Sequence, residues 1–320
     1  MGGLFDCGGS IVAGRRCILK DPCAALDRGQ TDSASRFGFP FLVFTLVLVL
    51  ASARGMSPGT PLILIFLVAG VVILGLPHGA LDPLVARQLW GAREFFTMTR
   101  FLILYAGIAM LCAAVWMLAP NAALVVFLII SAYHFGSDWE DLSPAWGQNA
   151  FGLVIVSLPT VHNAQAVTEI YRQLGASMAT GIVTVSQMVA VVAVVAALFA
   201  VSVRTKFRVS GLMELSAVLV GGLMLPPLLF FVCYFCLLHS PKHLMQTARS
   251  LGLSGVRDIA RSAAPTVLGT LILGFVLWMA LPSANYSEKV IRLVFIGLAA
   301  LTMPHMLLTE FSLRRDREIF

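Results

Sequence analysis

A series of long apolar stretches constrains the fold of this chain more than any other feature. Stretches of about 17 or more apolar residues recur from about Phe37 onward, and a helix of that length crosses a hydrocarbon core of about 30 Å. With 58% hydrophobic and 12% charged residues, the chain is too apolar for a soluble globular domain. Strand-like alternation is absent, so helices must satisfy the backbone in lipid. The sequence therefore predicts an all-α, polytopic integral membrane helical bundle.

The number of spans depends on how residues 211–239 are divided. This stretch is long for one span and short for two, and it contains Pro226 and Pro227, which interrupt helical hydrogen bonding. A break near Pro226 would place the basic loops and the C-terminus on one side of the membrane, as the positive-inside rule favours. We therefore expect 8–10 transmembrane segments, about ten if the break separates two spans. The apolar stretches lie at about 38–54, 60–76, 98–119, 121–139, 147–161, 181–203, 211–239, 264–281 and 288–312.

Charge and composition along the chain predict one domain preceded by a tail. Residues 1–36 are polar and glycine-rich without a long apolar core, so we expect a disordered N-terminal tail, followed by a single transmembrane domain at 37–320. The net charge of +6 comes from Arg and Lys residues between the apolar stretches. This pattern is typical of cytoplasmic flanks and not of nucleic-acid binding. We expect a multi-pass protein of the plasma membrane with both termini in the cytoplasm.

The six histidines are the main indication of function, because polar groups at membrane depth are costly and usually functional. If residues 211–239 form two spans, five of the six fall on one side of the membrane at similar depth. These are His78, His134, His239, His243 and His305. His162 falls on the other side, and we interpret it as an ordinary polar residue between helices.

Several neutral imidazoles at one depth predict a transition-metal site for iron, copper, zinc or nickel. His239 and His243 are spaced i, i+4, but Pro241 lies between them, so a helix break could aim the two rings. Asp82 and Asp138 each follow a histidine by four residues, where they could accept a hydrogen bond from the outer N–H of a ligating imidazole. The metal hypothesis rests on His78, His134, His239 and His243, whereas His305 could be a further ligand or a pocket residue.

Four separated motifs resemble those of the Brp/Blh family of membrane-bound beta-carotene 15,15'-dioxygenases. The resemblance extends over roughly residues 60–312, with the motifs in the family's order. They are GLPHGALD at 75–82, YHFGSD at 133–138, LLHSPKH at 237–243 and MPHMLL at 303–308.

The resemblance implies an enzyme that uses O2 to cleave beta-carotene at its central double bond, giving two molecules of retinal. It further implies Fe(2+) held by His78, His134, His239 and His243, with no catalytic side chain beyond these ligands. Beta-carotene dissolves only in the lipid bilayer, so an embedded enzyme would need no extraction step. The retinal could supply a rhodopsin. Four aromatic residues could line the substrate channel, although ordinary helix packing explains them equally well: Tyr133, Phe135, Tyr234 and Phe235.

Three other functions are compatible with an apolar, histidine-bearing chain. A haem-binding membrane protein would use histidine pairs as axial ligands. A di-iron hydroxylase or desaturase acting on another lipid would need more HxxxH boxes than the single one in this chain. A transporter would be expected to carry charged residues within spans and inverted repeats, and neither is clear.

Overall fold

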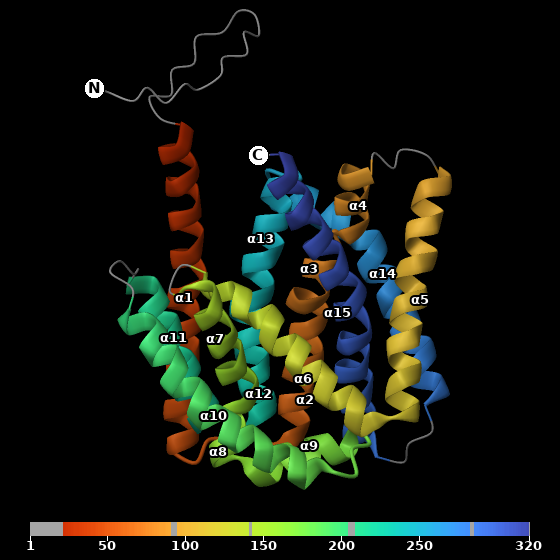
Figure 1. Cartoon of the computed structure of the whole chain (residues 1–320). Coiled ribbons are helices and arrows are strands. Elements are labelled where there is room, and N and C mark those ends of the chain that lie inside the picture. The colour runs from red at the N-terminus through yellow and green to blue at the C-terminus, as the bar shows by residue number, and fades with distance from the viewer. Residues whose placement is uncertain (1–21, 91–94, 141–142, 204–208, 282–284, 320) are drawn as a thin grey trace, which may run out of the picture.

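The computed structural model describes residues 22–90, 95–140, 143–203, 209–281 and 285–319, and within these ranges all regular structure is helical (Figure 1). The predicted all-α bundle is thus confirmed. In chain order the helices are α1 (Pro22–Ala53), α2 (Thr60–Gly70), η1 (Val71–Gly75), α3 (Leu76–Gly79), α4 (Asp82–Trp90), α5 (Phe95–Leu118), α6 (Pro120–Gly136), η2 (Ser137–Trp139), α7 (Ala145–Ser157), α8 (Pro159–His162), α9 (Ala164–Gln173), α10 (Ala179–Ser202), α11 (Val209–Met224), α12 (Pro227–Phe231), η3 (Val232–His239), α13 (Ser240–Ser250), α14 (Val256–Ala280) and α15 (Tyr286–Ile319).

Seven helical segments among the described residues are long and apolar enough to cross a membrane. An eighth is reached if α7–α8 and α9, which meet at an angle of 109°, form one broken span. The count of about ten is reached only by adding two shorter apolar helices, Phe37–Ala53 and Gly211–Met224. The expected break near Pro226 is confirmed, because α11 ends at Met224 and α12 begins at Pro227.

The beginning of the first helix differs from the boundary expected from the sequence. We predicted a polar tail through residue 36, whereas α1 already begins at Pro22, since a proline suits the first turn of a helix and the next proline comes only at Pro40. Residues 1–21 lie outside the described residues. The division of the chain into a disordered tail and one transmembrane domain stays a prediction.

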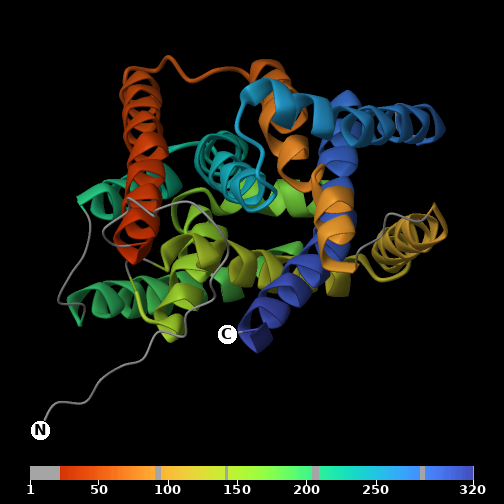
Figure 2. The same ribbon diagram turned by 90° about the horizontal axis from the view of Figure 1, so that it is seen from above.

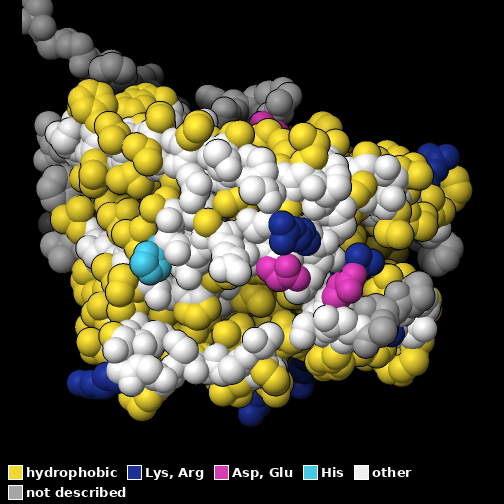
Figure 3. Space-filling model, turned by 90° about the horizontal axis from the view of Figure 1, so that it is seen from below, with side chains coloured by type: hydrophobic (Ala, Val, Ile, Leu, Met, Phe, Trp, Pro, Cys, Tyr) yellow, Lys and Arg dark blue, Asp and Glu magenta, His cyan; other side chains and the backbone are white. Residues whose placement is uncertain are grey.

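The continuous column of α12, η3 and α13 lies in the middle of the bundle, whereas α5 and α14 lie at its edge (Figure 2). Most of the column is buried, but α5 and α14 expose large apolar side chains, such as Ile103, Leu118 and Phe275. The lower end of the bundle, where helices end, shows hydrophobic side chains mixed with polar and charged ones (Figure 3). The exposed apolar surface of α5 and α14 is expected of helices that face lipid.

Helices α6 and α7 pack with their backbones almost in contact. A Cβ atom added to Gly152 on α7 would lie 1.7 Å from the carbonyl oxygen of Ala132 on α6. A Cβ atom on Gly136 would likewise lie 2.7 Å from the carbonyl oxygen of Gln148. Small residues permit this close approach between membrane helices, and it fixes the position of the C-terminal half of α6.

Two short π-helices, η1 and η3, contact each other in the centre of the bundle. Gly70 and Gly75 allow this contact, because Cβ atoms there would lie 3.0 Å from Sγ of Cys236 and 2.9 Å from a ring carbon of Phe235. A π-helical turn displaces the side chains that follow it, and such turns are frequent at functional sites. In this chain η1 ends three residues before His78, and η3 ends at His239.

Candidate metal centre

Five histidines from four separate parts of the chain converge between the central column and its neighbours. His78 lies on α3, His134 near the end of α6, and His239 and His243 on the central column, while His305 lies on α15. The ring of His305 lies 5.1 Å from that of His78 and 5.8 Å from that of His134, centroid to centroid. The ring of His239 lies 5.7 Å from that of His78 and 4.7 Å from that of His134. His162 is exposed on α8, at the lower end of the bundle in Figure 1.

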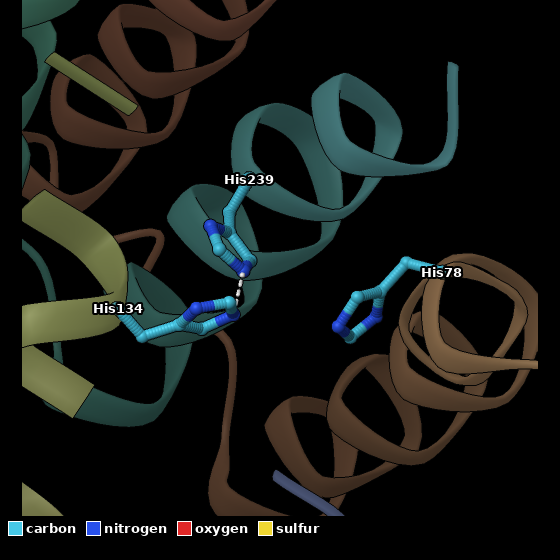
Figure 4. A group of neighbouring side chains, drawn as sticks. All are labelled: His78, His134 and His239. Carbon is cyan, nitrogen blue, oxygen red and sulfur yellow. Dashed lines mark hydrogen bonds between the residues drawn. The ribbon is translucent and has the colours of Figure 1, made fainter. Parts of the chain in front are cut away.

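His78, His134 and His239 form a group made of histidines alone in which each offers a nitrogen atom within 4.8 Å of the others. Their rings point toward one another from three different elements (Figure 4). Nε2 of His134 and Nε2 of His239 are 3.1 Å apart. Two nitrogens bound to one ion at about 2.1 Å would lie about 3.0–3.4 Å apart for bond angles between octahedral and tetrahedral. The separation in the structure matches that of two ligands of one ion.

Hydrogen bonds on the outer edges of two rings leave their inner nitrogens available. Nδ1 of His78 donates to the carbonyl oxygen of Gly75 over 2.5 Å, because a carbonyl can only accept. Nδ1 of His239 contacts the carboxylate of Asp138 at 2.9 Å, with the ring as donor. In each ring the proton thereby lies on Nδ1 and the lone pair on Nε2, which in His239 faces Nε2 of His134; this is the usual arrangement of metal-ligating histidines.

The carboxylate of Asp138 accepts hydrogen bonds from three side chains. Besides His239, it contacts Nε2 of His243 at 3.2 Å and the hydroxyl of Tyr234 at 2.5 Å. Asp138, His239 and His243 together form a second group with the spacing of metal ligands. With three donors directed at it, however, Asp138 is arranged as an acceptor that orients the imidazoles.

Asp82 occupies a corresponding position on the other side of the cluster. Both of its carboxylate oxygens lie 2.9 Å from Nδ1 of His305, and it accepts a hydrogen bond of 2.9 Å from the hydroxyl of Tyr105. Each carboxylate therefore contacts an imidazole far away in sequence and not the histidine four residues earlier. The reason is local: α3 ends before Asp82, and α6 tightens into η2 before Asp138, so neither pair shares a continuous α-helical face.

Of the four aromatic residues expected to line a channel, three surround the histidines. The rings of Phe135 and Phe235 lie 4.8 and 5.6 Å from that of His239, and Phe235 also lies 5.7 Å from His78. Tyr234 is buried with its hydroxyl on Asp138. Tyr133, in contrast, exposes 57% of its surface on the outer side of α6.

Two polar contacts near the site were not anticipated from the sequence. Tyr105 is a lone tyrosine in an apolar span, and its role becomes visible only in the structure, where its hydroxyl donates a hydrogen bond to Asp82. Lys242, one of the basic residues between the apolar stretches, is nearly buried and pairs with Glu214 on α11 at 2.5 Å. Because Lys242 lies between His239 and His243 in sequence, this pair ties the histidine-bearing column to α11.

Comparisons with known proteins agree on one family. The family model described as "Beta-carotene 15,15'-dioxygenase" matches residues 69–312. The protein named "Beta-carotene 15,15'-dioxygenase" from an uncultured marine bacterium (66A03) is 30% identical over 257 residues, covering 76% of this chain and 92% of its own length. The "Probable beta-carotene 15,15'-dioxygenase Blh" of Halobacterium salinarum is 27% identical over 286 residues, covering 75% of this chain and 81% of its own length.

No solved structure matches the chain. The family model covers most of the chain and includes all five histidines of the cluster. The resemblance noted in the four sequence motifs is thereby confirmed, and the chain belongs to the beta-carotene 15,15'-dioxygenase family.

Proposed function

We propose that this protein is a membrane-embedded, iron-dependent dioxygenase that cleaves beta-carotene at its central 15,15' double bond with O2, giving two molecules of retinal. The observation that carries the proposal is the meeting of histidines from separate helices in a chain of this family. Relatives named for the same reaction cover most of the chain. Nε2 of His134 and Nε2 of His239 have the separation expected of two ligands to one ion, and a nitrogen of His78 lies within 4.8 Å of both rings' ligand atoms.

We propose iron as the metal, bound by His78, His134, His239 and His243. Neutral imidazoles suit iron, copper, zinc and nickel, but zinc has no redox chemistry and could not activate O2. When bound, iron would supply the reaction with O2 that no protein side chain can perform. Asp138 would hold the rings of His239 and His243 in the orientation that binding requires.

The geometry favours one metal ion over a di-iron pair. Asp138 receives hydrogen bonds from His239, His243 and Tyr234, which occupies the carboxylate that a second ion would need. A haem protein would reveal itself by a Soret absorption band after purification. Bound iron without a Soret band would exclude a haem protein.

The surroundings of the cluster suit an apolar polyene. Phe135 and Phe235 place ring carbons beside the histidines and would exclude water from them. The outer surface of the bundle is apolar, so a substrate dissolved in lipid could reach the protein without entering water. These features support beta-carotene as the substrate and the lipid bilayer as its source, and two retinal molecules could then pass to a retinal-binding rhodopsin.

We place the protein in the plasma membrane with both termini in the cytoplasm. The described beginning of α1 and the end of α15 lie at the same end of the bundle (Figure 1), which supports termini on one side. The basic residues near α4 and after α13, such as Arg87 and Arg257, support the cytoplasm as that side.

Expression in bacteria that accumulate beta-carotene tests the function. We expect the cells to lose their colour and to accumulate retinal. The variant His134→Ala should lower retinal formation by at least about 100-fold, because removing a ligand costs more than removing a group that orients one. The matched control His162→Ala should form retinal as the wild type does, since its ring is exposed on α8.

Retinal is measured by chromatography and the amount of protein in the membrane by immunoblot. Unchanged carotene with normal amounts of wild-type protein would contradict the proposed reaction. Equal retinal formation by the wild type and His134→Ala would contradict the proposed role of the histidines.

A further inference from the structure

The candidate site contains the same three-residue unit twice. In the first unit, the hydroxyl of Tyr234 and Nδ1 of His239 both donate to Asp138, over 2.5 and 2.9 Å. In the second, the hydroxyl of Tyr105 and Nδ1 of His305 both donate to Asp82, each over 2.9 Å. The six residues come from five helical elements, because Tyr234 and His239 both lie on η3. The equivalence of the two units suggests that the two histidines have equivalent tasks.

The ring of His305 is buried against the other histidines. Only 5% of the residue is exposed, and its ring centroid lies 5.1 Å from that of His78 and 5.8 Å from that of His134. Its plane is nearly perpendicular to both, at 83° and 82°. In each pair, one ring therefore presents its edge to the face of the other.

The second nitrogen of this ring has no assigned partner. Because Asp82 holds the Nδ1–H, the lone pair lies on Nε2, at the opposite edge of the ring. Nε2 of His305 is buried and has no hydrogen-bond partner among the described residues. Buried polar atoms are rarely left unpaired, and each such atom calls for an explanation such as a missing ion.

We propose that His305 is a fifth nitrogen donor to the metal, and that Asp82 and Tyr105 are its positioning residues. This inference rests on the proposed metal site. The carboxylate fixes the tautomer with Nε2 unprotonated, and the phenol holds the carboxylate in place. His305 lies outside the group of His78, His134 and His239, whose ligand nitrogens are within 4.8 Å of one another, but its ring centroid is 5.1 Å from that of His78. It follows Pro304 directly, whose ring interrupts the hydrogen bonding of α15 at this point.

Binding of Co(II) to the purified full-length protein in detergent tests this inference without relying on activity. Cobalt reports coordination number through its ligand-field absorption. We expect His305→Ala to bind Co(II) at least about 100-fold more weakly, with an altered spectrum, because losing a ligand costs more than the 10–100-fold typical of losing an orienting partner. Asp82→Asn should shift affinity and spectrum in the same direction, and Tyr105→Phe less so, because Asp82 can still reach His305.

Added imidazole should restore the wild-type spectrum of His305→Ala, which a purely structural role of the ring would not produce. The control His162→Ala should match the wild type in affinity and spectrum. An unaltered Co(II) affinity and spectrum in His305→Ala would overturn the fifth donor while leaving the metal site intact. A wild-type protein that binds no Co(II) would overturn both proposals.

Discussion

Alanine in place of Gly152 is expected to destabilise the protein strongly and to disturb the metal centre with it. The added Cβ atom would lie 1.7 Å from the carbonyl oxygen of Ala132, so the backbones of α6 and α7 would have to separate. Overpacking of this kind costs about 3 kcal/mol or more, which corresponds to a fall in denaturation temperature on the order of 10 °C. Since α6 carries His134, iron binding should fall as well.

The measurement is thermal denaturation of the purified variants in detergent, and Gly181→Ala is the matched control. Gly181 lies on α10, and a Cβ atom there would meet nothing within 4 Å. The same substitution should therefore leave stability unchanged or raise it slightly, because alanine favours a helix. If Gly152→Ala and Gly181→Ala denature at the same temperature, the close packing of α6 on α7 does not hold.

The second large effect is expected from Asp138→Asn, which changes one oxygen to an amide nitrogen and keeps the shape of the side chain. The three donors that converge on the carboxylate would then meet an amide with a single acceptor oxygen. His239 and His243 would lose their orientation. We expect the affinity for Fe(II) to fall about 10–100-fold, as measured by equilibrium titration under anaerobic conditions.

Glu169→Gln provides the control for Asp138→Asn, because it makes the same chemical change on the exposed surface of α9. Its affinity for Fe(II) should equal that of the wild type. An Asp138→Asn protein that folds and binds Fe(II) as tightly as the wild type would show that the carboxylate does not orient the ligands.

Much of the fold could be predicted from the sequence, because the spans depend on local composition. Apolar length alone identifies helices such as α5, α10 and α14, and the paired prolines identify the break at Pro226. The number of membrane spans was harder to predict from the sequence than the positions of the long helices. Helix Gly211–Met224 is shorter than a bilayer crossing, and α7–α8 bends sharply into α9, which apolarity cannot reveal.

The candidate site was predictable only in part, because its contacts join distant parts of the chain. The motifs single out the histidines, and the span alternation places five of them at one depth. The hydrogen-bond partners of these histidines could not be predicted, because they lie far away in sequence: Asp82 and His305 are 223 residues apart, and Asp138 and His239 are 101 apart. Tyr105 gave no signal at all, since a tyrosine within an apolar helix is unremarkable until its neighbour is known.

The iron content of the protein purified from membranes tests the central claim most directly. We predict about one iron per chain in the wild type, because the rings of His78, His134 and His239 converge on one point. His239→Ala should carry almost none. A wild-type protein without iron after growth in iron-replete medium, or a His239→Ala protein with as much iron as the wild type, would contradict the account.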